Sequence, residues 1–414
     1  MAECASLLPP YDDRTIGRPP PSGCHDLAAI FLVFLRLGCT SFGGPVAHLG
    51  YFRAEFVARR GWLSEPAFAD IVALCQFLPG PASSQVGMAI GMARGGLAGA
   101  AAAWLGFTLP SALLMVGFAY GLGALGDPGQ AGWLHGLKIV AVAVVAGAVW
   151  SMARTLCPDR PRVTLALAAA LVALLVPSAA GQIGAIVLGA VAGRLLLPGE
   201  AVPEHVALAL RIPRGLSLAA LASFFMLLFG LPALAAATGS HFFAVVSGFY
   251  RAGALVFGGG HVILPLLQRA VVPPGWVPND LFLAGYGAAQ ALPGPLSTFA
   301  AYLGAVMRPA PSGWLGGLVC LVAIFAPSFL LLVGALPFWD ALRRRAGVRA
   351  ALRGVNAAVV GLLLAALYTP VWTSAILRPA DFAGALTAFV LLTAWRVAPW
   401  LVVLGGAAWG GLLG

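Results

Sequence analysis

Long apolar segments follow one another almost without interruption from Leu27 to the end of the chain. Of all residues, 60% are hydrophobic and 9% are charged, whereas soluble domains carry roughly 25% charged residues. Such a chain has too few charged residues to cover a water-facing surface. Because a bilayer core needs roughly 20 apolar residues per helical crossing, we expect an all-α polytopic membrane protein with about 13 membrane segments.

The net charge of +10 comes from arginines and one lysine, Lys138, which gather between the apolar segments. Loops that keep positive charge on one side of a membrane explain this pattern, and nucleic-acid binding does not. The six cysteines are scattered without the two-residue spacing of metal or redox motifs, so we predict no metal site and no cofactor.

We expect four regions along the chain. Residues 1–26 are rich in proline but lack the apolar core of a signal peptide, so they form a disordered tail. Residues 27–197 form a first transporter repeat and residues 241–414 a second. Residues 198–240 hold a polar linker and an extra transmembrane helix.

An internal repeat supports this division. Arg36 followed by Phe42-Gly43-Gly44 recurs as Arg251 followed by Phe257-Gly258-Gly259. Further matched positions keep the same order. They are Gly61-Trp62 with Gly275-Trp276, Gln76 with Gln290, Leu78-Pro79-Gly80-Pro81 with Leu292-Pro293-Gly294-Pro295, Ser83 with Ser297, and Pro110-Ser111 with Pro327-Ser328.

The two Pro-Gly segments, near Pro79 and Pro293, either cross the membrane or re-enter it. If both cross, about 16 basic residues lie inside and about 6 outside; if both re-enter, the stretch Arg343 to Arg353 moves outside and the split falls to about 13 against 9. The crossing arrangement is favoured. An odd number of crossings then separates the repeats and inverts the second, as in many transporters that bind substrate where the halves meet.

Each Leu-Pro-Gly-Pro element should break a helix, because proline removes an amide donor and glycine relaxes the backbone. The freed peptide groups must lie in protein or line a cavity. Pro81 and Pro295 suit the first position of a new helix, whose free amides attract anions. Ser83, Ser84, Ser297 and Thr298 would add hydroxyl donors. Simple proline kinks are the alternative.

Arg36 and Arg251 occupy equivalent positions within apolar segments, where a guanidinium requires a partner or a wet cavity. Together they would suit a dianion, because arginine donates in a planar fork; the alternative is that they snorkel to the interface. The Phe-Gly-Gly runs either allow close helix packing or unwind to expose amides. His261, after the second run, is either a packing residue or a proton carrier.

Intramembrane acids are scarce, and Asp70 is the best candidate for proton coupling, although it lies near a helix start and could pair with an arginine. Zinc-protease, nucleophile-elbow and phosphate-loop motifs are missing, so we do not predict an enzyme. The candidate substrate-binding residues are Arg36, Phe42, Gly43, Gly44, Gln76, Pro79, Gly80, Pro81, Ser83, Ser84, Arg251, Phe257, Gly258, Gly259, His261, Gln290, Pro293, Gly294, Pro295, Ser297 and Thr298.

The paired Phe-Gly-Gly and Pro-Gly-Pro motifs, with Arg36 and Gln76 and their counterparts, resemble the chromate ion transporter family over most of residues 30 to 370. The resemblance implies a bacterial inner-membrane protein with halves of opposite orientation that exports chromate and confers resistance, driven by the proton motive force. Sulfate or another oxyanion, including uptake, is the alternative within transport. A membrane enzyme or a nontransporting scaffold is the alternative of another class. We expect an oxyanion and the lipid bilayer as partners, and a homo-oligomer is possible.

Overall fold

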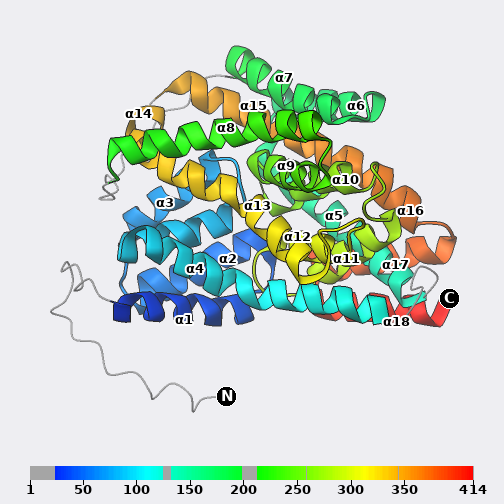
Figure 1. Cartoon of the computed structure of the whole chain (residues 1–414). Helices are drawn as coiled ribbons and strands as arrows, with labels where there is room; N and C mark the ends of the chain where they lie inside the picture. The colour runs from blue at the N-terminus through cyan, green and yellow to red at the C-terminus, as the bar shows by residue number, and fades with distance from the viewer. Residues whose placement is uncertain (1–23, 125–131, 198–211, 258, 344, 414) are drawn as a thin grey trace.

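The computed structural model describes residues 24–124, 132–197, 212–257, 259–343 and 345–413, and every regular element in these ranges is a helix (Figure 1). The all-α expectation is therefore confirmed for the described chain. Most of the expected tail and linker lies outside the described residues. The first half contains α1 (Cys24–Thr40), α2 (Gly44–Phe52), α3 (Glu65–Phe77), α4 (Ala82–Ala124), α5 (Gly132–Leu156), α6 (Arg160–Leu175) and α7 (Ala179–Leu196).

The second half begins after an additional helix, α8 (Arg214–Thr238). It contains α9 (His241–Ala254), α10 (Ile263–Val271), α11 (Asn279–Ala289), α12 (Phe299–Val306), α13 (Gly313–Ala335), α14 (Trp339–Arg343), α15 (Ala346–Ala366), α16 (Thr373–Ala375), α17 (Pro379–Thr393) and α18 (Pro399–Leu413). Short 3-10 turns precede α10 and α12, and a π-helical stretch, Arg53–Arg59, continues α2.

Five helical segments in the described residues are long and apolar enough to cross a membrane. They are Ala82–Ala124, Gly132–Leu156, Arg214–Thr238, Gly313–Phe338 and Ala346–Ala375. Large apolar side chains on their surfaces are exposed, for example Leu218 and Leu315. Such a surface is stable in lipid and unfavourable in water, so the protein is a multi-pass membrane protein.

The first Pro-Gly segment folds back on itself between α3 and the start of α4. Trp62 lies just before α3, and the guanidinium carbon of Arg94 lies 4.9 Å from the centre of its indole ring. The helical path of α4 is interrupted directly after Arg94, where Gly96 has a φ of 61°. Both ends of this segment are therefore neighbours, and the segment is a hairpin.

The second Pro-Gly segment, between α11 and α12, has the same form. The backbone N–H of Arg308, just after α12, donates to the carbonyl oxygen of Trp276, just before α11, at 3.0 Å. A Cβ atom on Gly304 of α12 would lie 2.1 Å from the carbonyl oxygen of Gly316, so α12 and α13 pack backbone to backbone. The entry and exit of this segment lie together.

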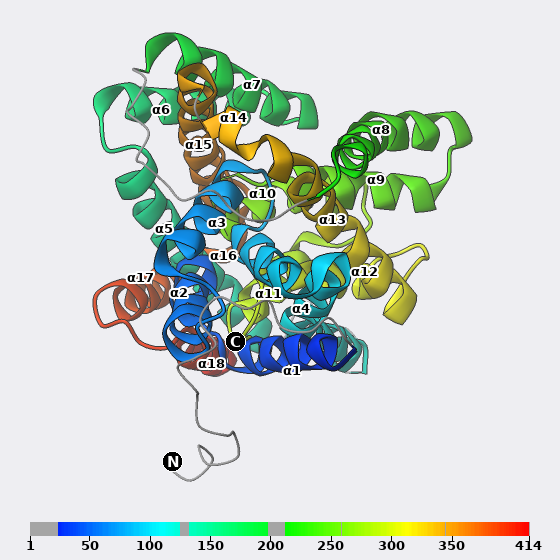
Figure 2. The same cartoon turned by 90° about the vertical axis from the view of Figure 1, so that its left-hand side faces the viewer.

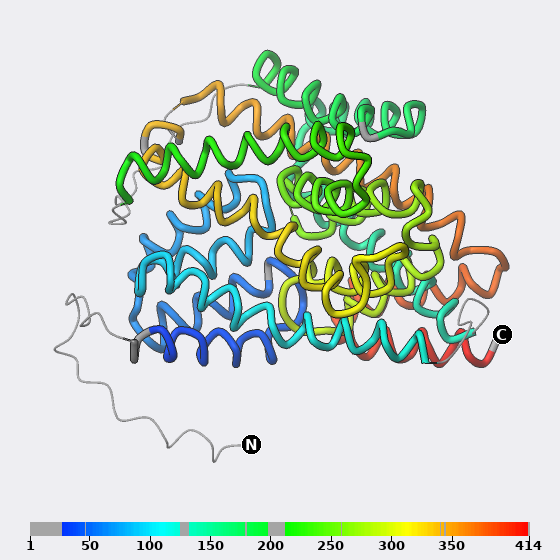
Figure 3. The backbone as a smooth tube through the Cα atoms, in the orientation of Figure 1, coloured from blue at the N-terminus to red at the C-terminus, as the bar shows by residue number. Residues whose placement is uncertain are grey.

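The Phe-Gly-Gly runs also reverse the chain. Phe34 of α1 stacks on Phe56, in the continuation of α2, with 4.9 Å between ring centres. In the second half, a Cβ on Gly248 of α9 would contact Ala270 of α10 at 3.3 Å. Each half thus begins with two hairpins, and Figure 3 shows the first pair in blue and the second pair in green to yellow.

The expectation that each Pro-Gly segment crosses the membrane once is not met, because its two ends lie side by side. The total of about 13 segments counted the Pro-Gly and Phe-Gly-Gly segments as crossings, so it does not describe this arrangement. The physical reason is that glycines with positive φ, including Gly43 (97°), Gly80 (132°) and Gly294 (89°), turn the backbone instead of merely kinking it.

The arginines between Arg343 and Arg353 stay at the same end of the molecule as those of α6. A Cβ on Gly347 would lie 2.7 Å from the guanidinium of Arg194 at the end of α7, and the charge of Arg353 acts on Asp159 at the start of α6. Re-entry was expected to move this cluster to the other end. The arginine cluster does not move, because the chain between α8 and α11 also forms a hairpin and returns to the end where it started. Four helices, α6, α7, α8 and α13, therefore cross between the arginines of α6 and this cluster, and an even number of crossings brings the chain back to the same end.

Glycines hold the long helices close together. A Cβ on Gly136 of α5 would lie 1.9 Å from the carbonyl oxygen of Gly406 of α18, and one on Gly354 of α15 would lie 2.0 Å from that of Gly189 of α7. In lipid, close backbone packing of this kind replaces the hydrophobic effect as the force between helices. Figure 2 shows the outcome, with α6, α7 and α15 together at one edge and α8 beside α9 at another.

Candidate functional site

The two Pro-Gly breaks meet the opposite half of the protein through reciprocal hydrogen bonds. The N–H of Gly80 donates to the carbonyl oxygen of Val256 at 2.7 Å, and the N–H of Gly294 donates to that of Ser41 at 2.9 Å. Ser41 and Val256 are equivalent, since each directly precedes its Phe-Gly-Gly run. The repeat seen in the sequence is therefore also a repeat of contacts.

Side chains around the breaks also make reciprocal contacts with the opposite half. A Cβ on Gly80 would lie 2.5 Å from Oγ of Ser328, and one on Gly294 would lie 2.9 Å from Oγ of Ser111. A Cβ on Gly260 would lie 3.4 Å from Cγ of Pro45, its equivalent in the first half. We call the region formed by residues 41–45, 78–81, 256–260 and 292–295, without the undescribed Gly258, the central crossing.

Several buried polar atoms, on Ser41 of the central crossing and on residues of the helices next to it, have no hydrogen-bond partner among the described residues. Buried polar atoms in proteins are normally paired, so each of these needs a water or a ligand. They gather from both halves and from five different helices or breaks. They are Oγ of Ser41, Nε2 of His48, Oγ of Ser84, Oε1 of Gln85, Oγ1 of Thr108, Nε2 of Gln290 and Oγ of Ser328.

The helices that follow the breaks begin differently. After the first break α4 starts directly at Ala82, and Ser83 and Ser84 are buried, with Oγ of Ser83 at 3.3 Å from Nδ1 of His48. After the second break a 3-10 turn, Leu296–Thr298, comes first. The amide and the hydroxyl of Thr298 both donate to Pro295, at 3.0 and 2.9 Å. Thr298 was expected to point free donors at the break, and these two donors are occupied by the turn itself.

The two symmetric arginines lie in different surroundings. Arg36 is exposed on α1, on the face that also carries Leu32. Arg251 is partly buried and lines a cavity together with Arg269 of α10. The lining of that cavity does not include Arg36, so this cavity does not join the two arginines into one site. The difference arises because α8 packs against α9, where Tyr250 donates to the carbonyl of Phe224 at 3.1 Å.

The remaining predicted residues divide in the same unequal way. Gln76 is exposed, whereas Gln290 is partly buried and lies near the hydroxyl of Tyr286. That hydroxyl lies 2.9 Å from Nδ1 of His261. Phe257, Pro293 and Gly259 lie within the central crossing, as do Phe42, Gly44, Pro79 and Pro81, while Gly258 is outside the described residues.

Asp70 lies on α3 and is fully buried. Its Oδ1 accepts a hydrogen bond from the indole N–H of Trp339 at 3.1 Å. Because Trp339 begins α14, this contact joins the first hairpin pair to the second half. No sequence pattern predicted this tryptophan contact, and the pairing with an arginine that the sequence suggested stays a prediction.

An ion pair and a histidine–aspartate contact near the start of α5 were missed by the sequence reasoning. Nζ of Lys138 lies 3.0 Å from Oδ1 of Asp280 on α11, and Nε2 of His135 lies 3.1 Å from Oδ1 of Asp381 on α17. The only lysine in an apolar segment was a usable signal for the first pair. Asp381 is fully buried and also accepts the N–H groups of Leu377 and Arg378, at 3.0 and 2.9 Å.

Asp280→Asn should lower the free energy of unfolding by about 1–3 kcal/mol, because it leaves the buried ammonium of Lys138 without a counter-charge; a fully buried pair would cost more, about 3–5 kcal/mol. The side chain of Asp280 is 54% exposed, which reduces the effect. Thermal unfolding in detergent measures the change. The double variant Lys138→Met with Asp280→Asn should be more stable than Asp280→Asn alone; equal stability would show that the pair contributes nothing.

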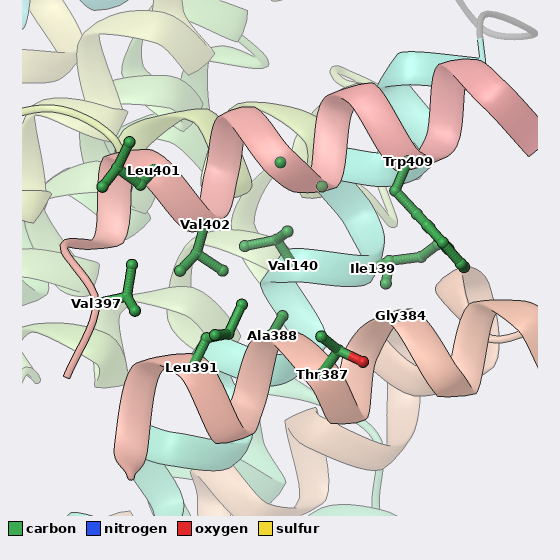
Figure 4. A pocket seen from close by; sticks show the side chains of 12 residues that line it. Ile139, Val140, Gly384, Thr387, Ala388, Leu391, Val397, Leu401, Val402 and Trp409 are labelled. Atoms are coloured by element: carbon green, nitrogen blue, oxygen red, sulfur yellow. The ribbon is translucent and has the colours of Figure 1, made fainter. Parts of the chain in front are cut away.

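Not every cavity suits an anion. One of about 250 Å³ lies between α5, α17 and α18 and is lined by apolar side chains, with Thr387 as the hydroxyl-bearing exception (Figure 4). A dianion in such a cavity would lose its hydration without gaining a charged partner. No cluster of three or more metal-ligating side chains occurs among the described residues.

Comparison with known proteins agrees with this architecture. A family model described as "Chromate transporter" matches residues 28–194 and again residues 243–411, so the repeat is recognised twice. A chromate transport protein of Pseudomonas aeruginosa is 30% identical over 365 residues, which is 85% of this chain and 82% of that protein. A probable chromate transport protein of Synechococcus elongatus is 28% identical over 351 residues, covering 83% of this chain and 84% of the relative.

A third relative, a chromate transport protein of Cupriavidus metallidurans, is 25% identical over 408 residues and spans 96% of both chains. No solved structure matches this chain. These relatives are transport proteins and not enzymes. With both halves matched by the family model, the chain belongs to the chromate transporter family.

Proposed function

We propose that this protein exports chromate across the bacterial inner membrane and thereby confers chromate resistance. The observation that carries the proposal is the central crossing, where each Pro-Gly break binds the residue before the Phe-Gly-Gly run of the opposite half, next to buried polar atoms without partners among the described residues. Chromate is a tetrahedral dianion at neutral pH, and hydroxyl, amide and imidazole donors can satisfy its four oxygens. The names of the relatives support chromate over other oxyanions.

The proposed mechanism is alternating access by two inverted repeats. In the first half, the chain enters and leaves the hairpins at the end of the protein that holds Trp62 and Arg94. In the second half, it enters and leaves them at the end that holds Trp276 and Arg308. Helices α4 and α13, which follow the hairpins, would then run in opposite directions through the membrane. Each half can open the central crossing to its own side.

The orientation in the membrane follows from the arginines. Arg94, Arg194 and Arg353 lie at the end where the hairpins of the first half open. Since positively charged loops stay in the cytoplasm, we assign this end to the cytoplasm. Chromate would enter from there and leave at the end that holds Arg308.

Transport can be tested with the purified protein in sealed vesicles. Vesicles that contain the protein should take up labelled chromate faster than empty vesicles, and an imposed proton gradient should increase the rate. Unlabelled sulfate tests the alternative cargo: if sulfate is carried and chromate only competes, the protein is a sulfate transporter. Absence of flux for chromate, sulfate and molybdate would overturn the transport proposal.

A further inference from the structure

A cavity of about 280 Å³ lies where α9 and α10 of the second half meet α7 of the first half and the additional helix α8. Its polar lining consists of two arginines, a glutamine, a serine and a tryptophan, and the rest is apolar. The full lining is Gln182, Ile183, Ala235, Ala244, Ser247, Gly248, Arg251, Ala252, Leu255, Leu266, Arg269, Ala270 and Trp276.

Within the described part of the chain, no negative charge faces this cavity. Arg251 and Arg269 line it, and no described carboxylate does. The ion pairs among the described residues include neither of them. Arg269 donates to the carbonyl oxygen of Pro177, which holds its side chain without neutralising it. Two guanidinium groups beside one cavity inside a membrane protein repel each other unless an anion lies between them.

The neutral donors complete an anion site. The amide nitrogen of Gln182 lies 3.3 Å from the carbonyl oxygen of Pro265, which leaves one of its two N–H groups for a ligand. Ser247 is buried on α9, one turn before Arg251, so both side chains lie on one helix face. A water occupies about 30 Å³ in the liquid, so the cavity has room for a tetrahedral anion with part of its hydration shell.

The cavity lies between one end of the protein and the central crossing. At its inner side is Leu255, which directly precedes Val256, the residue whose carbonyl binds the N–H of Gly80. At its outer side is Trp276, whose carbonyl binds the N–H of Arg308. An anion that leaves the central crossing toward the Arg308 end would meet this cavity on its way.

We propose that this cavity is a release site for tetrahedral dianions, in which Arg251 and Arg269 bind the oxygens and Gln182 and Ser247 assist. The site has no equivalent around Arg36, the counterpart of Arg251, because Arg36 is exposed. The inference rests on the proposed transport of an oxyanion. It adds Arg269, Gln182 and Ser247 to the residues that contact the substrate.

The test uses thiol labelling at Ala244, which lines the cavity without being a proposed ligand. Ala244→Cys is introduced into the full chain, with Cys39→Ser because Cys39 is exposed, and labelled with a membrane-impermeant methanethiosulfonate. The same chain without Ala244→Cys supplies the background rate. Sulfate, which does not oxidise thiols, serves as the protecting anion.

Sulfate should slow the labelling of Ala244→Cys, and Arg269→Gln or Arg251→Gln should raise the sulfate concentration needed at least tenfold. Arg269→Lys keeps the charge and should protect nearly as well as the native residue, which separates charge from folding. Arg308→Gln is the matched control, an exposed arginine at the same end outside this cavity, and should change nothing.

Protection that is equal in native protein, Arg251→Gln and Arg269→Gln would overturn the release site, as would an equal loss in Arg308→Gln. Vesicle flux of the same variants distinguishes this failure from failure of the proposed function. If the native protein transports chromate but sulfate gives no protection, only the release site is wrong. If protection behaves as expected but no oxyanion is transported, the anion site stands and the transport proposal falls.

Discussion

Gly80→Ala should reduce chromate flux in vesicles at least tenfold while the protein still inserts and folds. Gly80 has a φ of 132°, where an L-residue is strained by of order 1–3 kcal/mol. The new methyl group would also lie 2.5 Å from Oγ of Ser328 and 2.6 Å from Nε2 of Gln85. The backbone of the break must shift, and the hydrogen bond from Gly80 to Val256 is lost with it.

Gly239→Ala is the matched control for this prediction. Gly239 has a φ of 61° at the end of α8, and a Cβ atom there has nothing within 4 Å. It places an alanine at a positive φ, although a less strained one than at Gly80, and without the contact, so flux should stay near the native value. Adding Ser328→Ala to Gly80→Ala removes the oxygen that the methyl group meets and should restore part of the flux. Equal activity of Gly80→Ala and Gly239→Ala would show that the break has no special role.

The repeat and the breaks could be predicted from the sequence because both are encoded locally. A duplicated Leu-Pro-Gly-Pro element with Phe-Gly-Gly upstream is visible without any alignment, and proline and glycine act on the backbone where they stand. The reciprocal contacts of Gly80 and Gly294 then follow from the duplication, since equivalent residues make equivalent contacts in a symmetric fold.

The direction in which the chain leaves each break could not be predicted in the same way. A glycine such as Gly43 permits both a kink and a reversal, and packing decides between them. The decisive contacts join residues far apart along the chain, such as Trp62 with Arg94 and Trp276 with Arg308. Apolar length alone counted these segments as crossings, because a hairpin of two short helices has the same composition as one long helix.

The different surroundings of Arg36 and Arg251 also depend on an element outside the repeat. Helix α8 has no counterpart in the first half, and its packing against α9 encloses Arg251 in a cavity. Pattern matching treats both arginines alike because it compares only the repeated positions. The cavity residue Arg269 was missed for the same reason, since nothing in its local sequence distinguishes it from an arginine in a loop.

Asp70→Asn should abolish the stimulation of chromate flux by a proton gradient while chromate exchange across the membrane, without a gradient, continues. Asparagine is nearly isosteric and its carbonyl oxygen can still accept the N–H of Trp339, so the contact at 3.1 Å is kept while the negative charge and the ability to carry a proton are removed. Asp70 is fully buried on a hairpin of the proposed moving part, and a buried carboxylate in a transporter is a candidate proton carrier.

Trp339→Phe is the complementary variant, because it removes the donor and keeps the carboxylate of Asp70. If Asp70 carries protons, Trp339→Phe should keep the response to the gradient, with a lower free energy of unfolding by about 1–3 kcal/mol from the lost partner of a buried acceptor. If Asp70 only anchors α14, the order reverses: Asp70→Asn is close to native and Trp339→Phe is the damaging change. Parallel measurement of gradient-driven flux and of exchange in the two variants therefore separates a proton carrier from a structural contact.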